Sequence, residues 1–201
     1  MTKYKTTHLE DYTRIERDNY HLIILAKEPI DWVSISFDVL NYKGNPEMMI
    51  SGRDLHQYTS EIRNIEINPQ QSYVEIGAGM GEFIHAAARQ NPLQKPIVID
   101  PINYLLMWEM LEYAKIFAIR EPVLKRLSLY QERCRDILNP HKIRLLNCKL
   151  DRALAIYPEI RESADVVVDH YAAHYYTPVQ RKSEIENIER QLLKPTGRLL
   201  H

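Results

Sequence analysis

Residues 74–83 of the 201-residue chain read VEIGAGMGEF. A β-rich run that begins at Ser72 leads into this stretch, and glycine then occupies alternate positions at Gly77, Gly79 and Gly81. Glycine lets a turn adopt positive φ and lets a ligand come close to the backbone. The run EFIHAAARQ after it predicts a helix, whose N-terminus would add oriented N–H groups. The stretch therefore predicts a strand, a ligand-binding turn and a helix.

From Ser72 onward, strands and helices are predicted to alternate. Short apolar runs predict strands at PIVID, KIRLLN, ADVVVD and RLL, with helices at 103–119, 121–138, 151–161 and 177–193 between them. Near-continuous apolar strands separated by helices are typical of a mostly parallel sheet covered on both faces. Because such crossovers are right-handed, the predicted fold class is a doubly wound α/β fold. Ligands bind beyond the carboxyl ends of its strands, where the glycine turn lies.

The residues before this region predict a different organisation. Residues 8–27 place their larger apolar side chains near helical spacing, which predicts an amphipathic helix. Residues 33–39 alternate between apolar and polar, which favours a strand, although a short helix from Asp31 is an alternative. Residues 52–66 predict another helix. We therefore expect a mainly helical extension over 1–51 and a ligand-binding domain over 52–201.

The spacing of the glycines separates the classes of nucleotide-binding turn. A dinucleotide-binding turn reads G-x-G-x-x-G and a P-loop ends in GK[ST], whereas this turn reads G-x-G-x-G. Preceded by Glu75, it resembles the first motif of class I S-adenosylmethionine-dependent methyltransferases, [D/E]-x-G-x-G-x-G. Asp100, 19 residues after Gly81, and the run LLKPTGRLL agree with that family in position. The resemblance covers about residues 52–201 and implies a Rossmann-like methyltransferase fold that binds S-adenosylmethionine.

The resemblance also implies roles for individual residues. Glu75 would organise the ammonium group of the cofactor's amino acid tail, and Asp100 would accept hydrogen bonds from the ribose hydroxyls. The glycines would let the adenosine and the tail lie over the turn, and Asp169 would lie near the tail. The family often has an acid after the third strand that contacts adenine, but Asn147, Cys148 and Lys149 stand there. The expected cofactor-binding residues are Glu75, Gly77, Ala78, Gly79, Gly81, Asp100, Pro101, Asn147, Cys148 and Asp169.

The segment DHYAAHYYTP follows the fourth strand, where substrate meets the methyl group in the family. His170, Tyr171 and His174 are the candidate catalytic residues, because a histidine near neutral pKa can deprotonate a nucleophile. The alternative is that these side chains only pack the loop. His170 and His174 are four residues apart, a spacing that binds metal on a helix, but no third ligand lies within sequence reach. No metal is therefore predicted.

Composition limits the partners that the sequence predicts. The formal net charge is −1, from 26 basic and 27 acidic side chains, which gives no reason to expect nucleic acid or an anionic membrane. There is no predicted membrane span or signal peptide, and two lone cysteines are typical of reduced thiols, so we expect a cytoplasmic protein. The default methyl acceptor is then a small molecule.

The C-terminal end of the sequence leaves turnover open. Family members continue through a fifth strand, a helix and a hairpin, whereas this chain stops four residues after Gly197. We therefore expect missing C-terminal strands, in a truncated form or in a homo-oligomer that completes the sheet edge. The alternative functions are a non-catalytic protein that binds S-adenosylmethionine and, disfavoured by the glycine spacing, a nicotinamide-dependent oxidoreductase.

Overall fold

The computed structural model describes residues 4–10, 12–18, 20–27, 30–37, 48–51, 55–62, 65–118 and 120–201. These residues form two compact units. The first, the antiparallel unit, comprises Met1–Gly52 and Asn103–Arg135; the second, the parallel-sheet unit, comprises Arg53–Ile102 and Asp136–His201. The predicted division into domains at residues 51 and 52 stays a prediction.

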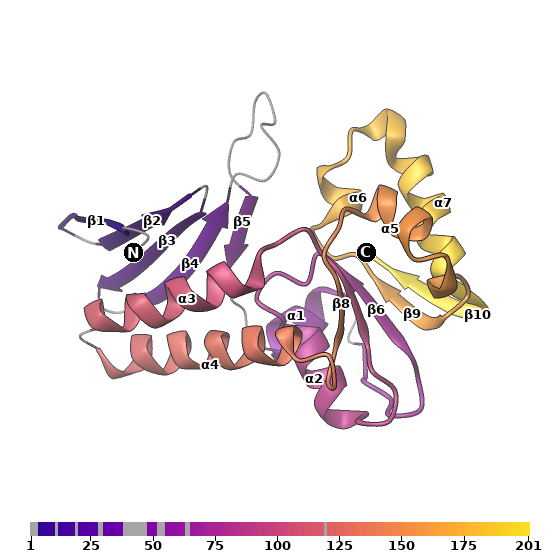
Figure 1. Ribbon diagram of the computed structural model, residues 1–201, viewed down its shortest axis with the longest axis horizontal. Coiled ribbons are helices and arrows are strands. Elements are labelled where there is room, and N and C mark those ends of the chain that lie inside the picture. Colours follow the sequence, from indigo (N-terminus) through magenta and orange to yellow (C-terminus); the bar gives the residue numbers. More distant parts are fainter. Residues whose placement is uncertain are drawn as a thin grey trace. The chain divides into compact units, whose positions relative to one another are not determined.

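The antiparallel unit contains a five-stranded sheet in the order β1-β2-β3-β4-β5 (Figure 1). Its strands are β1 (Lys5–His8), β2 (Tyr12–Arg17), β3 (Tyr20–Lys27), β4 (Ile30–Phe37) and β5 (Met48–Ser51), each antiparallel to its neighbour. Helix α3 (Tyr104–Ala114) packs on β2 and β3 and is followed by η1 (Lys115–Phe117) and α4 (Glu121–Leu138).

The predicted N-terminal helix is therefore wrong, and so is the mainly helical extension. Tyr20, Leu22 and Ile24 are buried, whereas His21 and Ile23 between them are only partly buried, so burial follows the period of two of a strand. The chain reverses at Asp18, whose φ of 53° lies in the left-handed region. The spacing of these apolar residues fits both a helix and a β-hairpin. The pairing of β3 with β2 and β4 shows that the chain forms strands here. For residues 33–39 the strand alternative is confirmed as far as Phe37, in β4, and residues 38 and 39 lie outside the described residues.

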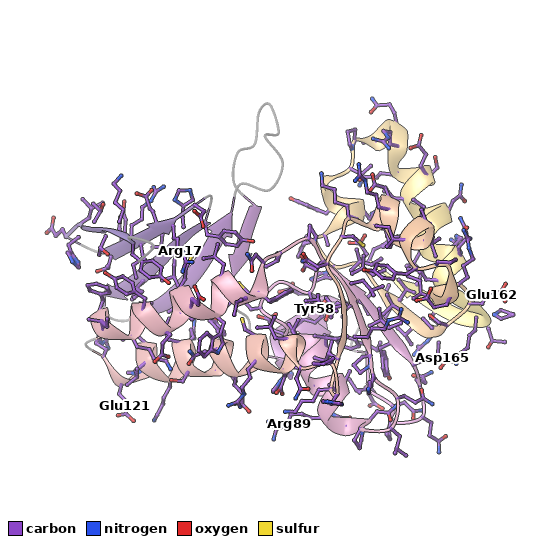
Figure 2. All side chains as sticks on the ribbon, viewed as in Figure 1. Arg17, Tyr58, Arg89, Glu121, Glu162 and Asp165 are labelled. Carbon is purple, nitrogen blue, oxygen red and sulfur yellow. The ribbon has the colours of Figure 1, made fainter. Side chains whose placement is uncertain are left out.

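Contacts between α3 and the strands hold this unit together. The backbone N–H of Asn103 donates to the Tyr20 hydroxyl at 2.7 Å. The Tyr4 and Tyr113 rings stack with their centroids 4.1 Å apart. The guanidinium of Arg17, labelled in Figure 2, pairs with the Glu109 carboxylate.

The parallel-sheet unit confirms the predicted α/β fold class. Five parallel strands pair in the order β10-β9-β6-β7-β8: β6 (Tyr73–Ile76), β7 (Ile97–Ile99), β8 (Arg144–Leu146), β9 (Ala164–Val168) and β10 (Leu193–Leu200). The chain proceeds outward from β6 to β8 and then returns to the other side of β6 for β9. The topological switch point therefore lies between β6 and β9, where such sheets bind ligands.

Helices cover both faces of this sheet (Figure 1). Helices α1 (Leu55–Glu61) and α2 (Glu82–Gln90) share a buried cluster with Tyr73, Val166 and Val168. On the other face, α5 (Leu150–Ile156), η2 (Pro158–Ile160) and α7 (Lys182–Leu192) pack with Val74 and Val167. Between β9 and α7 the chain forms α6 (Ala173–Tyr176) and η3 (Val179–Arg181). None of the helices in the described ranges combines the length and apolar composition needed to cross a bilayer.

Candidate functional site

The glycine turn joins β6 to α2 at the carboxyl end of the central strand. All three of its glycines have positive φ, 64° at Gly77, 54° at Gly79 and 74° at Gly81. The Gly77 N–H donates to the Ile99 carbonyl at 2.9 Å, which fixes the turn to β7, and Gly81 is the N-cap of α2. Glycine adopts such a conformation without the steric cost that a Cβ imposes. The alternate glycines are therefore required by the backbone.

Gly77 is also required by packing. A Cβ added to Gly77 would lie 2.3 Å from the Cβ of Ala172, in the loop after β9. This loop therefore lies directly against the turn, and the space that Gly77 provides is taken by Ala172. This close approach brings together the loops that follow β6 and β9, the two strands between which the topological switch point lies.

Glu75 lies inside the unit, beneath the turn. Its side chain is fully buried; Oε1 accepts a hydrogen bond from the Tyr58 hydroxyl at 2.6 Å, and Oε2 accepts one from the Ile84 N–H at 3.0 Å. Ile84 is in the first turn of α2, so the carboxylate caps that helix. Burial, followed by repulsion from Glu82 and Asp100, raises the pKa of Glu75 to about 8, although both hydrogen bonds act in the opposite direction.

Asp100 follows β7 and is buried beside the turn. Its Oδ1 accepts a hydrogen bond from the Ile102 N–H at 2.9 Å, and its Oδ2 lies 3.4 Å from the Gly79 N. The amide of Asn147 donates to the carbonyls of Asp100 at 3.1 Å and of Ile102 at 2.8 Å. The end of β8 therefore fixes the backbone after β7, and that backbone holds the carboxylate against Gly79.

The remaining predicted cofactor residues surround the same strand ends. Ala78 is buried within the turn, and Pro101 is exposed directly after Asp100. Cys148 is partly buried after β8; its N–H donates to the Leu146 carbonyl, and burial, then Asp151, raises the pKa of its thiol. Their roles in cofactor binding stay predictions.

Asp169 ends β9 and organises the loop that contacts Gly77. It is almost fully buried, and its carboxyl accepts hydrogen bonds from the N–H groups of Ala172 at 3.2 Å and His174 at 2.7 Å. Burial, followed by the neighbouring Glu189 carboxyl, raises the pKa of Asp169 well above its usual range. Asp169 thus fixes the conformation of the segment that carries the three candidate catalytic residues.

Those three residues have different surroundings. The Nε2 atom of His170 lies 2.8 Å from Glu61 Oε2, and its ring meets Tyr58 edge-on at 5.2 Å. Tyr171 is half-exposed and has a φ of 54°, a conformation uncommon for residues other than glycine. A strained backbone at a candidate site motivates a functional hypothesis.

His174 lies apart from His170, on the first turn of α6. Its ring stacks on that of His201, with the centroids 4.0 Å apart and the planes 5° from parallel, and its Nε2 lies 3.6 Å from Glu186 Oε1. Burial, then the neighbouring His201 and Lys182, lowers the pKa of His174. The two histidines that are close in sequence therefore have different partners.

Sequence analysis missed four residues that complete these arrangements, namely Tyr58, Glu61, Glu189 and His201. Tyr58 lies within the helix predicted over 52–66, but nothing local indicates that its hydroxyl reaches Glu75. Glu61 pairs with His170, 109 residues away. Contacts between such distant positions depend on the strand order, which no short motif encodes.

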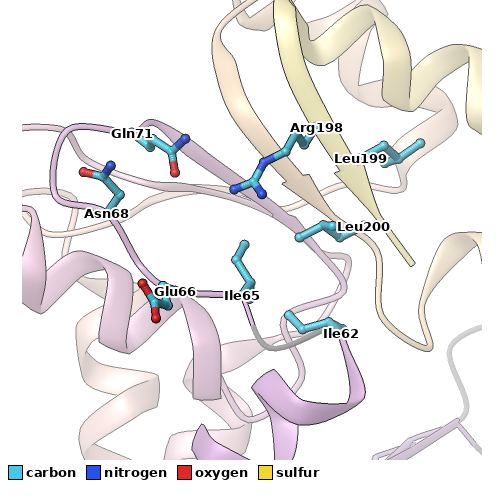
Figure 3. Close-up of a pocket in the computed structure, with 8 residues that line it drawn as sticks. All are labelled: Ile62, Ile65, Glu66, Asn68, Gln71, Arg198, Leu199 and Leu200. Atoms are coloured by element: carbon cyan, nitrogen blue, oxygen red, sulfur yellow. The ribbon is translucent and has the colours of Figure 1, made fainter.

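The parallel-sheet unit also has a cavity of about 710 Å³, and the glycine turn does not line it (Figure 3). Its walls come from the segment between α1 and β6 and from the end of β10. Ile65, Leu199 and Leu200 form apolar parts of the wall, with Arg198 and Gln71 beside them.

Comparisons with known proteins find similarity only among solved structures. No protein-family profile matches the sequence, and no curated protein matches it. The solved structures that match include several S-adenosylmethionine-dependent methyltransferases. The antibiotic-resistance methyltransferase Kmr is 16% identical, with a TM-score of 0.40 over 76% of this chain and 65% of its own. The chain thus spans slightly less than two thirds of that protein.

Two further solved structures match this chain at similarly low identity. The fibrillarin pre-rRNA processing protein of Methanococcus jannaschii is 11% identical, with a TM-score of 0.45 over 99% of this chain and 76% of its own. A 16S rRNA (adenine(1408)-N(1))-methyltransferase of Catenulisporales acidiphilia, solved with its cosubstrate SAM, is 14% identical, with a TM-score of 0.38 over 76% of this chain and 62% of its own. All these TM-scores are below 0.5.

Proposed function

We propose that this chain is an S-adenosylmethionine-dependent methyltransferase that binds its cofactor at the carboxyl ends of β6 and β7. One observation carries the proposal: Asp100 Oδ2 lies 3.4 Å from the N of Gly79, within a turn whose three glycines all have positive φ. A nucleoside cofactor needs both a bare backbone against which to lie and a carboxylate for its ribose hydroxyls. These features come from the ends of neighbouring strands and lie side by side.

The residues present fit this cofactor. Gly79 and Gly81 carry no side chain that would keep adenosine from the backbone, and the N-terminus of α2 begins at Gly81. Asp100 would bind the ribose hydroxyls through charge-assisted hydrogen bonds. Asn147 and Cys148 would line the adenine pocket, with Ala78 and Pro101 beside them, and Asp169 would lie toward the amino acid tail. The cofactor supplies a methyl group that its positively charged sulfur already activates.

Glu75 supports the cofactor indirectly in this proposal. Because both carboxyl oxygens of Glu75 accept hydrogen bonds from the protein, the side chain fixes α1 and α2 relative to the glycine turn. The ammonium group of the cofactor would then meet a turn whose shape Glu75 maintains.

For the acceptor we propose a small molecule, in a protein of the cytoplasm. The net charge of −1 gives no electrostatic reason to prefer nucleic acid. The protein would align the nucleophile with the methyl group and remove its proton. His170 is the candidate for the proton transfer because Glu61 orients its ring, with Tyr171 and His174 as the other candidates.

A calorimetric titration tests the proposed function. We expect S-adenosylmethionine and S-adenosylhomocysteine to bind, NAD not to bind, and Asp100→Ala to weaken binding of both sulfur compounds. Absence of heat with either sulfur compound at millimolar concentration would exclude the proposal. Production of S-adenosylhomocysteine from fractions of a metabolite extract then distinguishes an enzyme from a protein that only binds the cofactor.

A further inference from the structure

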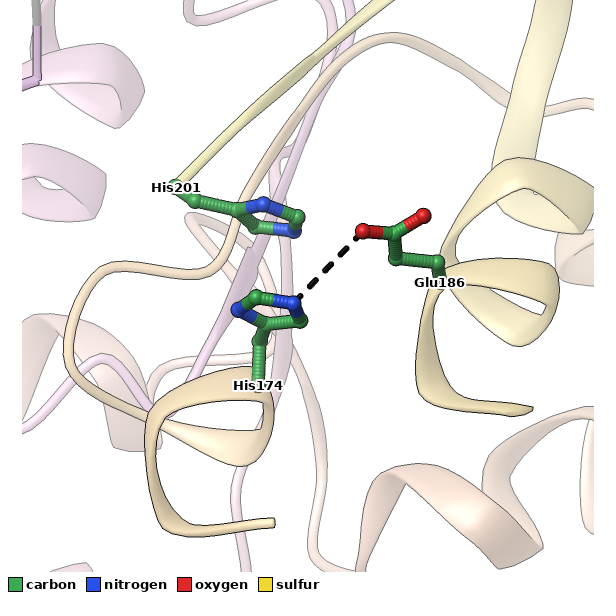
Figure 4. A group of neighbouring side chains, drawn as sticks. All are labelled: His174, Glu186 and His201. Atoms are coloured by element: carbon green, nitrogen blue, oxygen red, sulfur yellow. Dashed lines mark ion pairs between the residues drawn. The ribbon is translucent and has the colours of Figure 1, made fainter. Parts of the chain in front are cut away.

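The parallel-sheet unit brings together two histidines and a glutamate from three separate segments. His174 comes from α6, Glu186 from α7, and His201 follows β10 (Figure 4). One ligand atom of each lies within 4.8 Å of the others. We propose that His174, Glu186 and His201 bind a divalent transition-metal ion, with Zn²⁺ as the ion that suits the ligand set.

The distances are close to those that a metal requires. Zn²⁺ binds nitrogen and oxygen ligands at about 2.0–2.1 Å, so the ligand atoms of a tetrahedral site lie about 3.4 Å apart. His174 Nε2 and Glu186 Oε1 are 3.6 Å apart, and the third atom is within 4.8 Å of both. Figure 4 shows the two imidazole rings stacked one above the other, with the Glu186 carboxylate facing their edges. Because the His174 and His201 rings stack in parallel planes, the exposed His201 side chain would have to turn out of this stack for both rings to face the same ion.

A fourth side chain next to these three provides an independent reason to expect a cation. Glu189 is fully buried on α7, one turn after Glu186, and its Oε2 lies 2.9 Å from His201 Nε2. Its Oε1 is also buried, and the Asp169 carboxyl, which shares a hydrogen bond with Glu189, lies beside it. Two carboxyl groups buried side by side repel one another when both are charged, and a bound cation would reduce that repulsion.

The ligand chemistry favours zinc over magnesium or calcium. Imidazole nitrogen is a ligand for Zn²⁺ and its neighbours in the transition series, whereas magnesium and calcium take oxygen ligands. Two imidazoles and one carboxylate leave a fourth position for water or for Glu189. The carboxylate that contacts a ligating histidine typically fixes its ring orientation, and Glu189 stands in that relation to His201.

Such an ion would join three segments of the unit at the loop beside the glycine turn. His174 lies two residues after Ala172, which packs on Gly77, whereas Glu186 belongs to α7 and His201 directly follows β10. The metal would therefore fix the segment that carries the candidate catalytic residues. The His170 and His174 pair, which the sequence suggests through its spacing, is not the pair that the fold assembles.

The proposal is tested on the full chain, stripped with EDTA and titrated with ZnCl₂ in a calorimeter. We expect one Zn²⁺ per chain, and visible absorption typical of four-coordinate Co²⁺ when Co²⁺ replaces it. His174→Ala and Glu186→Gln should each weaken Zn²⁺ binding by more than about tenfold, since even loss of an outer-shell partner costs about 10–100-fold. Glu186→Gln keeps the shape of a partly exposed side chain, so its fold should be unchanged.

The matched control is His141→Ala, which removes an exposed imidazole outside the cluster. It should bind Zn²⁺ as the unchanged chain does. Absence of Zn²⁺ binding, binding that survives His174→Ala and Glu186→Gln, or an equal loss in His141→Ala would each overturn the proposal. No cofactor is present in this titration, so its result is separate from the outcome for methyl transfer.

Discussion

The hydroxyl of Tyr58 donates a hydrogen bond of 2.6 Å to Glu75, the acidic residue of the glycine motif. The second oxygen of the same carboxyl accepts the N–H of Ile84 in α2. A single buried side chain therefore connects α1, β6 and α2. This contact accounts for the acid beside the glycine turn at a position that no solvent reaches.

Removing the Tyr58 hydroxyl should destabilise the protein. Tyr58→Phe leaves Glu75 Oε1 buried without this donor, so we expect the free energy of unfolding to fall by about 1–3 kcal/mol. Urea denaturation measures this change. Tyr175→Phe removes a hydroxyl from an exposed ring and should change stability by less than about 0.5 kcal/mol. Equal stability of Tyr58→Phe and the unchanged chain would contradict the assigned role of this hydrogen bond.

Glu75 should make the protein less stable as the pH rises. Its pKa is about 8 in the folded chain against 4.5 for an unperturbed glutamate, because burial, Glu82 and Asp100 disfavour the charge. Between these values the folded state holds the proton more tightly than the unfolded state does. The free energy of unfolding should therefore decrease from about pH 5 to about pH 8, by at most about 1.4 kcal/mol per pH unit from this group.

Comparison with Glu75→Gln isolates this contribution. The substitution should reduce the slope of the unfolding free energy against pH between about pH 5 and about pH 8. It should do so even if it also lowers the stability by a constant amount at every pH. Glu66→Gln, at an exposed position in the same unit, is the control and should leave the slope unchanged. The same slope in the Glu75→Gln variant would show that another group causes the pH dependence.

Gly77→Ala should destabilise the turn for two separable reasons. The φ of 64° costs a non-glycine residue about 1–2 kcal/mol, and the new Cβ would lie 2.3 Å from that of Ala172. In thermal denaturation, adding Ala172→Gly to Gly77→Ala should restore the stability lost to the clash but not the stability lost to the unfavourable φ. A Gly77→Ala protein as stable as the unchanged chain would show that the loop after β9 does not pack on the turn.

Asp165 should stabilise the sheet through its negative charge. Burial alone would raise its pKa, but hydrogen bonds from Lys194 Nζ at 2.8 Å and from Ser72 N and Oγ at 2.8 and 2.7 Å hold the pKa near 2. Because this pKa is lowered, the stabilisation is present above pH 3.8 and is lost as the pH falls toward 2.

Asp165→Asn should consequently cost stability in urea at pH 6, and the difference from the unchanged chain should shrink as the solution is acidified. Lys194→Met removes only one of the three hydrogen-bond donors to Asp165. It should therefore lower the free energy of unfolding at pH 6 by less than Asp165→Asn does. A difference between Asp165→Asn and the unchanged chain that stays constant down to pH 3 would contradict the lowered pKa.

Sequence patterns predicted the parallel-sheet unit well because its strands are buried on both faces. Such strands are continuous apolar runs, and residues typical of turns mark their ends. The run EFIHAAARQ forms α2 with the predicted bounds, and Asp100 follows its strand as expected. In the antiparallel unit, β2 and β3 were mispredicted as a helix because Tyr20, Leu22 and Ile24 alternate in a segment whose other apolar residues also fit a helix. Only pairing with neighbouring strands resolves that ambiguity.

The residues of the candidate site likewise include some that the sequence could place and some that it could not. Residues at strand ends, such as Gly79 and Asp100, could be placed together because parallel strands end on the same edge. The partners of His174 could not be predicted, since Glu186 and His201 meet it only after α7 folds back on the sheet. The roles of the candidate cofactor and catalytic residues stay predictions until a ligand is bound.

The most direct test of the central claim is a crystal structure of the chain grown with S-adenosylhomocysteine. We predict electron density for the nucleoside above Gly79 to Gly81, with the ribose hydroxyls within hydrogen-bond distance of Asp100. Density elsewhere in the protein, or none at millimolar ligand, would contradict the assignment of this turn as the cofactor site.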